Sequence, residues 1–269
     1  MANDKFQLTK EAALKYDSHS VPAMFAPLAQ ATMEKIDLPP SAHVIDIACG
    51  TGALTREITS SLAGRGRIVG VDLNETMVTV ARENQPKSNH NVEWYAADVC
   101  NIPCDDKSFD YGFIQQGLQF FPNKSASLKE VHRVLRSKGQ LILTCWSAIS
   151  SFNAALADAL ERNVDETAAT KARAPFSFRD GNIITKLLRD AEFEIVKHDA
   201  VVLERRFDDL LSQIMALPIE ADLRQAGDTV IKTVVTEVSA ELSQYYKDGI
   251  LCVPQEAHFF CAKPVASTK

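Results

Sequence analysis

Three aspartates at equal spacing mark the part of this sequence that could do chemistry. Asp46, Asp72 and Asp98 lie 26 residues apart, and each comes at the end of an apolar run typical of a buried strand. Residues 44–52 read Val-Ile-Asp-Ile-Ala-Cys-Gly-Thr-Gly, and a helical pattern follows them. Strand, glycine loop and helix in this order bring backbone N–H groups against a ligand at a helix N-terminus. We therefore expect a ligand site where the three strands end.

The charge of these acids indicates the charge of the ligand. An acid at the end of the first strand would repel the pyrophosphate of a dinucleotide, whereas it would attract an ammonium or a sulfonium group. The dinucleotide fingerprint Gly-x-Gly-x-x-Gly would need glycines at 48, 50 and 53, but the chain has Ala48, Gly50 and Ala53. The phosphate-binding motif Gly-x-x-x-x-Gly-Lys-Ser/Thr is also absent. A nicotinamide oxidoreductase is therefore disfavoured.

The glycine loop resembles the first motif of the class I S-adenosylmethionine (SAM)-dependent methyltransferases. That motif, usually Asp-x-Gly-x-Gly-x-Gly, maps onto residues 46–52, with Ala48 in place of the first glycine. The resemblance covers residues 43–147 and extends over 175–202. It implies a Rossmann-like α/β fold, in which a seven-stranded, mostly parallel sheet carries helices on both faces. It also implies an antiparallel seventh strand inserted at the sheet edge.

The order of the predicted elements agrees with such a doubly wound sheet. Strands are expected near 43–48, 67–72, 92–97, 109–115, 139–146, 194–202 and 256–262. Helices are expected near 53–63, 75–84, 123–136 and 180–191. Turn signals separate them at 63–66, 105–108 and 137–139. Repeated strand–helix units imply parallel strands joined by right-handed crossovers.

The chain is predicted to be a single methyltransferase domain over residues 1–269, with its core in two pieces, about 41–202 and 255–263. The remaining segments are predicted to form a helical lid over the cofactor; they are 1–40, 148–178 and 203–253. In the last of them Val230, Val234, Val238 and Leu242 recur at four-residue steps, as on one face of a helix. Simple packing on the sheet, or a homodimer through the lid helices, is the alternative.

The resemblance assigns cofactor-binding residues at the carboxyl ends of the strands. The amino-acid part of SAM is expected to lie among residues at the ends of the first and fourth strands: Asp46, Ala48, Gly50, Thr51, Gly52 and Gln115. Asp72 is placed to accept hydrogen bonds from the ribose hydroxyls. Around the adenine, contacts are expected from Leu73, Met77, Asp98 and the N–H of Val99. A single aspartate at any of these places could instead be a helix cap or turn residue.

The end of the fourth strand narrows the substrate class. Residues 117–122, Gly-Leu-Gln-Phe-Phe-Pro, resemble the small-molecule branch that includes the ubiquinone/menaquinone-biosynthesis methyltransferases and fungal bis-thiomethyltransferases. The Asn/Asp-Pro-Pro-aromatic motif of related nucleic-acid and glutamine N-methyltransferases is absent. Metal-dependent catechol-type enzymes place a metal-binding aspartate where this chain has Gln115. No metal and no nucleic-acid partner are therefore expected.

Candidates for substrate contact or for a catalytic base are fewer and less specific. A hydroxyl acceptor would need a base, for which histidine is the usual choice near neutral pH. His19 lies in the N-terminal segment after Tyr16, and His258 is expected at the start of the final strand, on the cofactor edge. Gln119 could orient a substrate. Tyr16, Phe25 and Trp146 could form an apolar wall. The other histidines are interpreted as structural or exposed: His43, His90, His132 and His198.

Composition excludes several classes of protein. The 269 residues carry a formal net charge of −6 with a pI near 5.6, which gives no electrostatic footprint for nucleic acid. No run of about 18 apolar residues predicts a membrane span, and the N-terminus lacks the apolar core of a signal peptide. The six scattered cysteines are typical of a cytoplasmic protein rather than of a disulfide framework. No Cys/His pair with ligand spacing follows Cys100 and Cys104 to complete a metal site.

These observations predict a SAM-dependent methyltransferase that acts on a small, partly apolar molecule. Whether the acceptor atom is O, N, S or C stays open. A thiol S-methyltransferase is the alternative within enzymes. A non-catalytic SAM-binding protein with a regulatory or interaction role is the alternative from another class, because no clear base is present.

Overall fold

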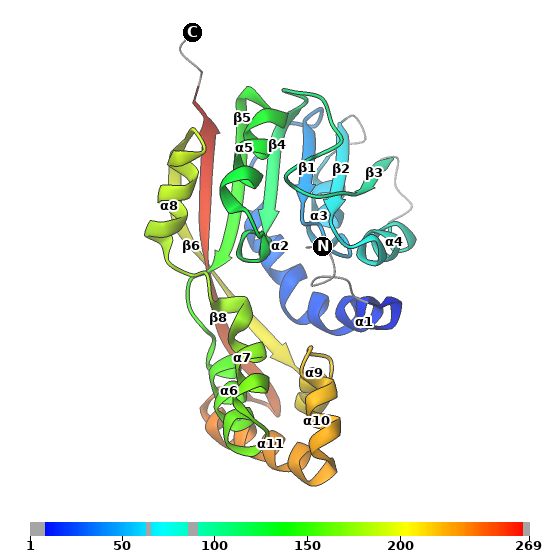
Figure 1. Cartoon of the computed structure of the whole chain (residues 1–269), viewed down its shortest axis with the longest axis vertical. Coiled ribbons are helices and arrows are strands. Elements are labelled where there is room, and N and C mark those ends of the chain that lie inside the picture. The colour runs from blue at the N-terminus through cyan, green and yellow to red at the C-terminus, as the bar shows by residue number, and fades with distance from the viewer. Residues whose placement is uncertain (1–8, 63–65, 86–90, 266–269) are drawn as a thin grey trace.

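One mixed β-sheet organises the molecule in a computed structural model that describes residues 9–62, 66–85 and 91–265 (Figure 1). Within these residues the sheet has eight strands in the order β3-β2-β1-β4-β5-β8-β6, with β7 paired to β8. Their bounds are β1 (His43–Ile47), β2 (Arg67–Asp72), β3 (Val92–Ala96), β4 (Phe109–Gln115), β5 (Leu135–Trp146), β6 (Phe193–Phe207), β7 (Tyr246–Lys247) and β8 (Ile250–Pro264). The predicted Rossmann-like α/β class is confirmed, with one short strand more than expected.

The first five strands run parallel, so their carboxyl ends meet at one edge. Asp46 on β1 is the register partner of Gly70 on β2 and of Phe113 on β4. β1 is therefore paired in register with both β2 and β4, and the three strands end together at the predicted site. Packing on β2 also requires a glycine, because a Cβ atom at Gly70 would lie 2.5 Å from ring atoms of Trp94.

The last two long strands differ most from expectation. β8 is antiparallel as predicted, but it lies between β5 and β6, so β6 and not β8 forms the sheet edge. Both strands are 15 residues long, because alternation of buried and exposed side chains continues past the predicted ends. β5 begins at Leu135, and the turn expected at 137–139 is instead an irregularity in its pairing with β4. Of the turn expected at 63–66, residues 63–65 lie outside the described residues.

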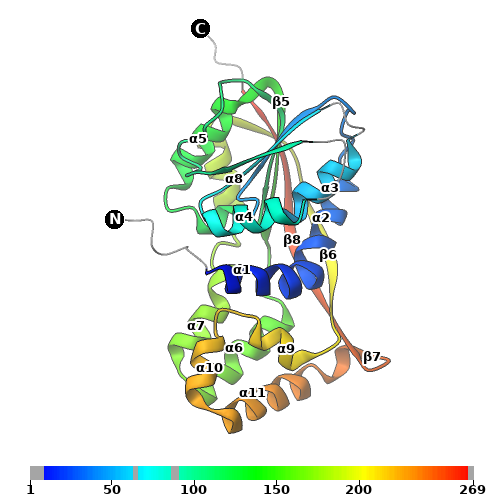
Figure 2. The same ribbon diagram turned by 90° about the vertical axis from the view of Figure 1, so that its right-hand side faces the viewer.

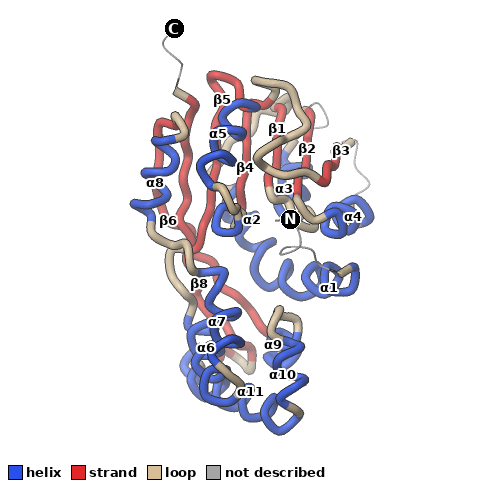
Figure 3. Tube along the Cα trace, viewed as in Figure 1, coloured by secondary structure: helices blue, strands red, loops and turns tan. Residues whose placement is uncertain are grey.

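Helices cover both faces of the sheet (Figure 3). Short 3-10 helices join some of them and, like the π-helix of the N-terminal segment, carry the label η. On the core they are α2 (Ala26–Met33), α3 (Ala53–Ser61), α4 (Glu75–Glu83), η3 (Leu118–Phe120), α5 (Lys124–Val134) and α8 (Gly181–Asp190). Successive side chains of β1 point to opposite faces of the sheet, so their contacts show which helices pack on each face. Ile45 and Ile47 pack in the cluster with α5 and α8, whereas Val44 packs in the cluster with α2 and α3. Asp46 shares the parity of Val44 and therefore faces α3.

A second group of helices lies beyond the carboxyl ends of the parallel strands, and we call it the helical lobe (Figure 1). Its members are α6 (Ser151–Asn163), α7 (Glu166–Arg173), η4 (Ala174–Phe176), α9 (Leu210–Met215), α10 (Glu220–Ala226), α11 (Asp228–Glu241) and η5 (Ser243–Tyr245). The lobe has its own buried cluster, to which Val234, Val238 and Leu242 contribute. The predicted apolar stripe of 203–253 thus packs inside the lobe against α6, and the ends of β6 and β8 contribute Phe207, Leu251 and Val253 to the same cluster.

The N-terminal segment crosses the gap between sheet and lobe (Figure 2). It consists of α1 (Lys10–Lys15), a π-helix η2 (Tyr16–Phe25) and α2. Pro22 inside η2 has no N–H to donate, which disfavours regular α-helical hydrogen bonding there. Lys15 forms a salt bridge of 2.8 Å with Glu220 of the lobe, and Lys10 forms one of 3.0 Å with Glu83 of α4. The segment is therefore fastened to both parts.

Candidate functional site

The loop between β1 and α3 adopts the backbone conformation that a close ligand approach needs. Gly50 and Gly52 have φ values of 55° and 82°, in the left-handed region that glycine adopts readily. A Cβ atom at Gly50 would point at Tyr16 and lie 3.8 Å from its hydroxyl oxygen. Ala48 also has a positive φ, 58°, which costs a non-glycine residue about 1–2 kcal/mol. Ala48, which stands where the motif usually has its first glycine, therefore strains the backbone and also leaves less space for a ligand to approach the loop.

Two carboxylates lie beside this loop, and Asp46 is buried whereas Asp72 is partly buried. Asp46 is 1% exposed, and its Oδ2 accepts a 2.6 Å hydrogen bond from the Thr55 hydroxyl. Asp72 accepts from the Gly50 N–H at 2.8 Å and from the Asn74 N–H at 2.9 Å. Burial raises the pKa of Asp46 to about 7, and the Thr55 hydrogen bond opposes that rise while the charge of Asp72 adds to it. Burial also raises the pKa of Asp72.

No cation of the described residues contributes to either pKa. A buried and a partly buried acid without a positive partner are costly for a protein by itself, because desolvated charges are stabilised mainly by opposite charges. A ligand that carries an ammonium and a sulfonium would supply the missing positive charge. The two acids are therefore suited to bind the positively charged SAM, and they would repel a ligand that carries phosphate groups.

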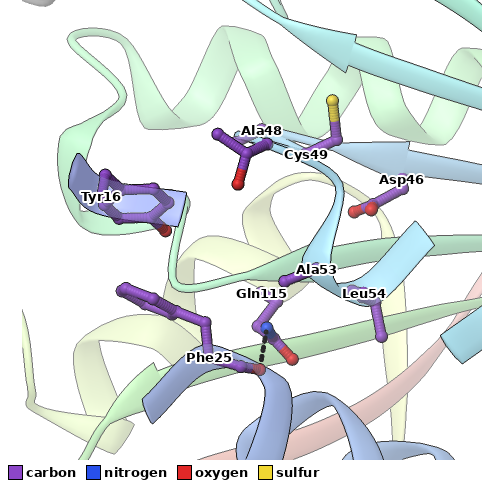
Figure 4. A pocket seen from close by; sticks show the side chains of 9 residues that line it. Tyr16, Phe25, Asp46, Ala48, Cys49, Ala53, Leu54 and Gln115 are labelled. Atoms are coloured by element: carbon purple, nitrogen blue, oxygen red, sulfur yellow. Dashed lines mark hydrogen bonds between the residues drawn. The ribbon is translucent and has the colours of Figure 1, made fainter. Parts of the chain in front are cut away.

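A small hollow opens between the loop and the N-terminal segment (Figure 4). It is lined by Tyr16, Phe25, Asp46, Ala48, Cys49, Thr51, Ala53, Leu54 and Gln115. The rings of Tyr16 and Phe25 lie 5.2 Å apart, and the Gln115 amide donates to the Phe25 carbonyl at 3.1 Å. Gln115 Oε1 and the Thr51 hydroxyl are buried and find no hydrogen-bond partner in the part of the chain that the structure describes. A polar ligand in the hollow would satisfy both, which is the second point at which the residues fit SAM.

The cofactor-binding residues predicted from the sequence divide into two groups. Asp46, Ala48, Thr51 and Gln115 line the hollow, while Gly50 and Asp72 adjoin it through their hydrogen bond. The residues predicted to surround adenine lie further along the same edge. Leu73 and Met77 flank Asn74, which caps the N-terminus of α4. Asp98 is exposed and accepts the Cys100 N–H at 2.8 Å, as a turn residue does, and Val99 is buried in the core.

Of the proposed catalytic residues, only Tyr16 lines the hollow. The His19 ring lies on η2, with Nδ1 2.8 Å from the Ser18 hydroxyl. The Gln119 amide donates to Gln116 Oε1 at 3.2 Å, and its oxygen accepts from the Cys145 thiol at 3.6 Å. Burial raises the pKa of the Tyr16 hydroxyl, and the charges of Asp72 and Asp17 add to that rise. Tyr16 therefore stays a neutral phenol that can donate a hydrogen bond, and it is no ready base.

Two predicted positions are corrected by the structure. His258 is not at the start of the final strand, because β8 begins at Ile250; its ring bonds to His198 at 3.1 Å and to the Arg179 carbonyl at 3.0 Å. Trp146 is 2% exposed and packs on Phe176 in the core, so it is no wall of the hollow. Sequence reasoning in turn missed Thr55. In the sequence, the signal for its hydrogen bond to Asp46 is a hydroxyl residue nine positions after Asp46, in the predicted helix that follows the glycine loop.

Ionisation of Asp46 gives a pH dependence that can be measured. Its folded pKa of about 7 exceeds the usual value of about 3.9, so the folded protein holds a proton that the unfolded chain lacks between those pH values. The stability of the ligand-free protein is therefore expected to fall as pH rises through this window. SAM favours the charged carboxylate, so its affinity should increase between pH 6 and about 7.5.

Calorimetric titrations of SAM over this range test the expectation. Asp46→Asn serves as the control, since it keeps the shape of the side chain but cannot titrate. A pH dependence of SAM affinity that persists unchanged in Asp46→Asn would show that another group is responsible.

Comparison with known proteins agrees with the geometry of the site in indicating a methyltransferase. A methyltransferase domain signature matches residues 45–143. A demethylmenaquinone methyltransferase of Staphylococcus saprophyticus is 32% identical over 110 residues, which are 41% of this chain and 47% of that protein. The demethylmenaquinone methyltransferase of Listeria welshimeri is 33% identical over 111 residues, with the same two shares. The chain thus spans about half the length of the curated relatives it matches.

Solved structures extend the likeness from the motif region to the fold. A phosphoethanolamine N-methyltransferase 2 of Haemonchus contortus, in complex with phosphomonomethylethanolamine and S-adenosylhomocysteine, gives a TM-score of 0.60 at 18% identity. The match covers 97% of this chain and 59% of that protein. None of the described helices combines the length and apolar character needed to cross a bilayer. Strand order, glycine loop and the match to a methyltransferase domain over residues 45–143 together make the chain similar to the class I SAM-dependent methyltransferases.

Proposed function

We propose that the protein transfers the methyl group of SAM to a small, partly apolar molecule. The observation that carries the proposal is the left-handed glycine loop beside two carboxylates, Asp46 buried and Asp72 partly buried, that lack a positive partner among the described residues. A cation-bearing cofactor relieves that charge, and bound SAM supplies an electrophilic methyl group. What remains for the chain is to bind, to orient the acceptor and to exclude water.

The described residues divide this work between them. Asp72 would exchange its hydrogen bonds to the loop for bonds to the ribose hydroxyls, and Asp46 would stabilise the positive end of the cofactor. Gln115 and Thr51 would use their unsatisfied oxygens on polar groups of the ligand. Phe25 and Tyr16 would cover the site from the N-terminal side and keep water from the transferring methyl.

The acceptor is proposed from the relatives. Two of them are named demethylmenaquinone methyltransferase, so a quinol ring carbon is the first candidate acceptor for this chain. The aromatic and apolar lining of the hollow supports such a substrate, since Phe25 and Leu54 can contact a ring.

Formation of S-adenosylhomocysteine (SAH) in the presence of a reduced demethylmenaquinone analogue tests this proposal. Product mass and fragmentation identify the methylated atom, and a thiol such as dithiothreitol serves as the competing acceptor. Methylation of the thiol alone would refute the quinol assignment. Tight SAM binding without turnover on either acceptor would favour a non-catalytic SAM-binding protein.

Activity is proposed to need no metal. Among the described residues, no group of three or more His, Cys, Asp or Glu side chains is placed to hold an ion. Turnover is therefore expected to be the same with and without EDTA. Loss of turnover in EDTA that magnesium or zinc restores would contradict this.

The N-terminal segment is proposed to act as part of a lid. Tyr16 lies over the loop, and Asp17 fastens η2 to α3 through Arg56 at 3.5 Å and to α4 through Asn84 at 2.7 Å. Addition of SAH is expected to slow hydrogen exchange in residues 10–30, because the ligand adds contacts on their buried side. Deletion of residues 1–30 should reduce turnover far more than thermal stability.

Exchange mass spectrometry and melting curves of the two proteins measure these effects. Full activity of the truncated protein, or no ligand-induced protection, would mean that the segment only packs on the core. Tyr16 and His19 would then be removed from the proposed site.

A further inference from the structure

A buried arginine on β6 has no role in the site described above. Arg205 is 4% exposed and is paired in register with Val253 of β8. Leu203, two residues earlier on the same face, belongs to the cluster on the α2/α3 side of the sheet, and Gln255 is its register partner on β8. The hollow opens on that same side. Arg205 therefore lies at the junction of the core and the helical lobe, beyond the end of β5.

Within the described part of the chain this guanidinium lacks an acid. It makes one hydrogen bond there, from Nη1 to Asn153 Oδ1 at 2.7 Å, and Nε is buried without a partner. The rings of Phe152 and Phe207 each lie 4.9 Å from the guanidinium carbon. Burial lowers the pKa of Arg205 to about 9, which leaves it a cation at neutral pH. A fold gains nothing from an unpaired buried cation, since apolar side chains would pack there without the desolvation cost.

The guanidinium is held in one orientation. Asn153 lies in the first turn of α6 and fixes Nη1, while the two phenylalanine rings flank the group. The edge formed by Nε and Nη2 is therefore the one without a protein partner. That edge is the fork that binds a carboxylate or a similar pair of oxygens by two parallel hydrogen bonds.

A second unsatisfied group lies on the same face of the sheet. Gln255, the register partner of Leu203, is 2% exposed; its amide donates to the Ala148 carbonyl at 3.2 Å, and its Oε1 is buried without a partner among the described residues. Ala148 follows Trp146, the last residue of β5, and β6 packs against η2, which carries Tyr16 and Phe25 (Figure 2). Two unsatisfied polar groups thus lie where the chain passes from the site to the lobe.

We propose that Arg205 binds an anionic oxygen of the methyl acceptor, either a carboxylate or an ionised phenol on an apolar body. The inference rests on the proposed function and adds the charge of the substrate to it. Phe152 and Phe207 provide apolar contact beside the anion, and Gln255 accepts a hydrogen bond from a neighbouring hydroxyl of the same molecule. The lobe then selects the substrate by charge, while the glycine loop holds the cofactor.

The test uses the full chain saturated with SAH and two pairs of probes. In the first pair 2-naphthoate is compared with neutral 2-naphthamide; in the second, 4-nitrophenolate at pH 8.5 is compared with 4-nitroanisole. The protein is expected to bind the anion of at least one pair about tenfold or more tightly than its neutral partner, as a charge-assisted hydrogen bond allows. The pair that shows this preference identifies the source of the anionic oxygen.

Arg205→Met is expected to abolish the preference while leaving the SAH dissociation constant within about twofold. Its melting temperature should stay within about 2 °C of the parent or rise, because an unpaired buried charge is removed. Arg205→Lys keeps a charge but lacks the fork, so its preference should be reduced. Arg206→Met is the matched control, since Arg206 is exposed on the opposite face of the same strand and should behave as the parent does.

Three results would overturn the inference: equal binding of both members in both pairs, a preference that survives in Arg205→Met, or an equal loss in Arg206→Met. Failure of the parent to bind SAH would instead refute the proposed function, whatever the probes do. If Arg205→Met does not fold, Arg205→Lys serves as the test. An unchanged preference for the anion in Arg205→Lys would show that paired hydrogen bonds from Nε and Nη2 are not its cause.

Discussion

Gly50→Val is expected to abolish SAM and SAH binding and to leave most of the secondary structure intact. The Cβ atom would lie 3.8 Å from the Tyr16 hydroxyl, so the two γ-methyl groups would occupy the hollow where the amino-acid part of the cofactor is proposed to bind. A β-branched residue is also strained at a φ of 55°. Calorimetric titration with SAH measures the loss, and circular dichroism reports the fold.

A control at a second glycine separates the two effects of the Gly50→Val substitution, which are filling of the hollow and strain in the backbone. Gly249 has a φ of 82°, and a Cβ there would meet nothing within 4 Å. Gly249→Val should therefore lower thermal stability without changing SAH affinity. Normal SAH binding by Gly50→Val would mean that the loop is not the cofactor site. If Gly50→Val unfolds, Gly50→Ala, with about 1–2 kcal/mol of strain and no γ-carbons, takes its place.

Asp72→Ala is expected to weaken SAM binding by about 1.5–3 kcal/mol, or roughly 10- to 150-fold, since it removes charge-assisted hydrogen bonds. Its carboxylate also holds the Gly50 N–H at 2.8 Å, so the loop loses a fixed point in the same variant. Asp72→Asn keeps an acceptor but not the charge, and its effect should be intermediate.

Titration calorimetry with SAM and with SAH checks the prediction. Affinity in Asp72→Ala equal to that of the parent would remove Asp72 from the site. Equal losses in Asp72→Ala and Asp72→Asn would assign the effect to charge alone rather than to the hydrogen bonds.

Local patterns were sufficient to predict the cofactor half of the molecule. Apolar runs that end in Asp46 and Asp72, with a glycine loop between strand and helix, specify parallel strands and their common edge with no long-range information. The same patterns placed α3, α4, α5 and α8 within a few residues. The hydrogen bond between Thr55 and Asp46 required knowing which face of α3 meets the sheet, which the spacing alone does not state.

Long-range features could not be read in this way. Insertion of β8 between β5 and β6 depends on which strands pair across the chain, and residue periodicity is the same in either position. Arg205 stands in the run Glu-Arg-Arg, where a buried arginine and an exposed one look alike in sequence. His258 was misplaced because β8 begins at Ile250, eight residues before it, and runs through Pro254 without ending there.

The position of β8 has a consequence for how the chain reaches its native state. This strand is paired with β5, β6 and β7, and the Cys261 thiol donates to Gln140, 121 residues earlier in the chain. Until residues 250–264 arrive, a nascent chain leaves the edges of β5 and β6 unpaired and the clusters of both sheet and lobe uncovered. Such high contact order predicts slow folding that stays exposed to aggregation until late. Once formed, β8 joins the two clusters, so the lobe and the sheet are expected to unfold in one cooperative transition.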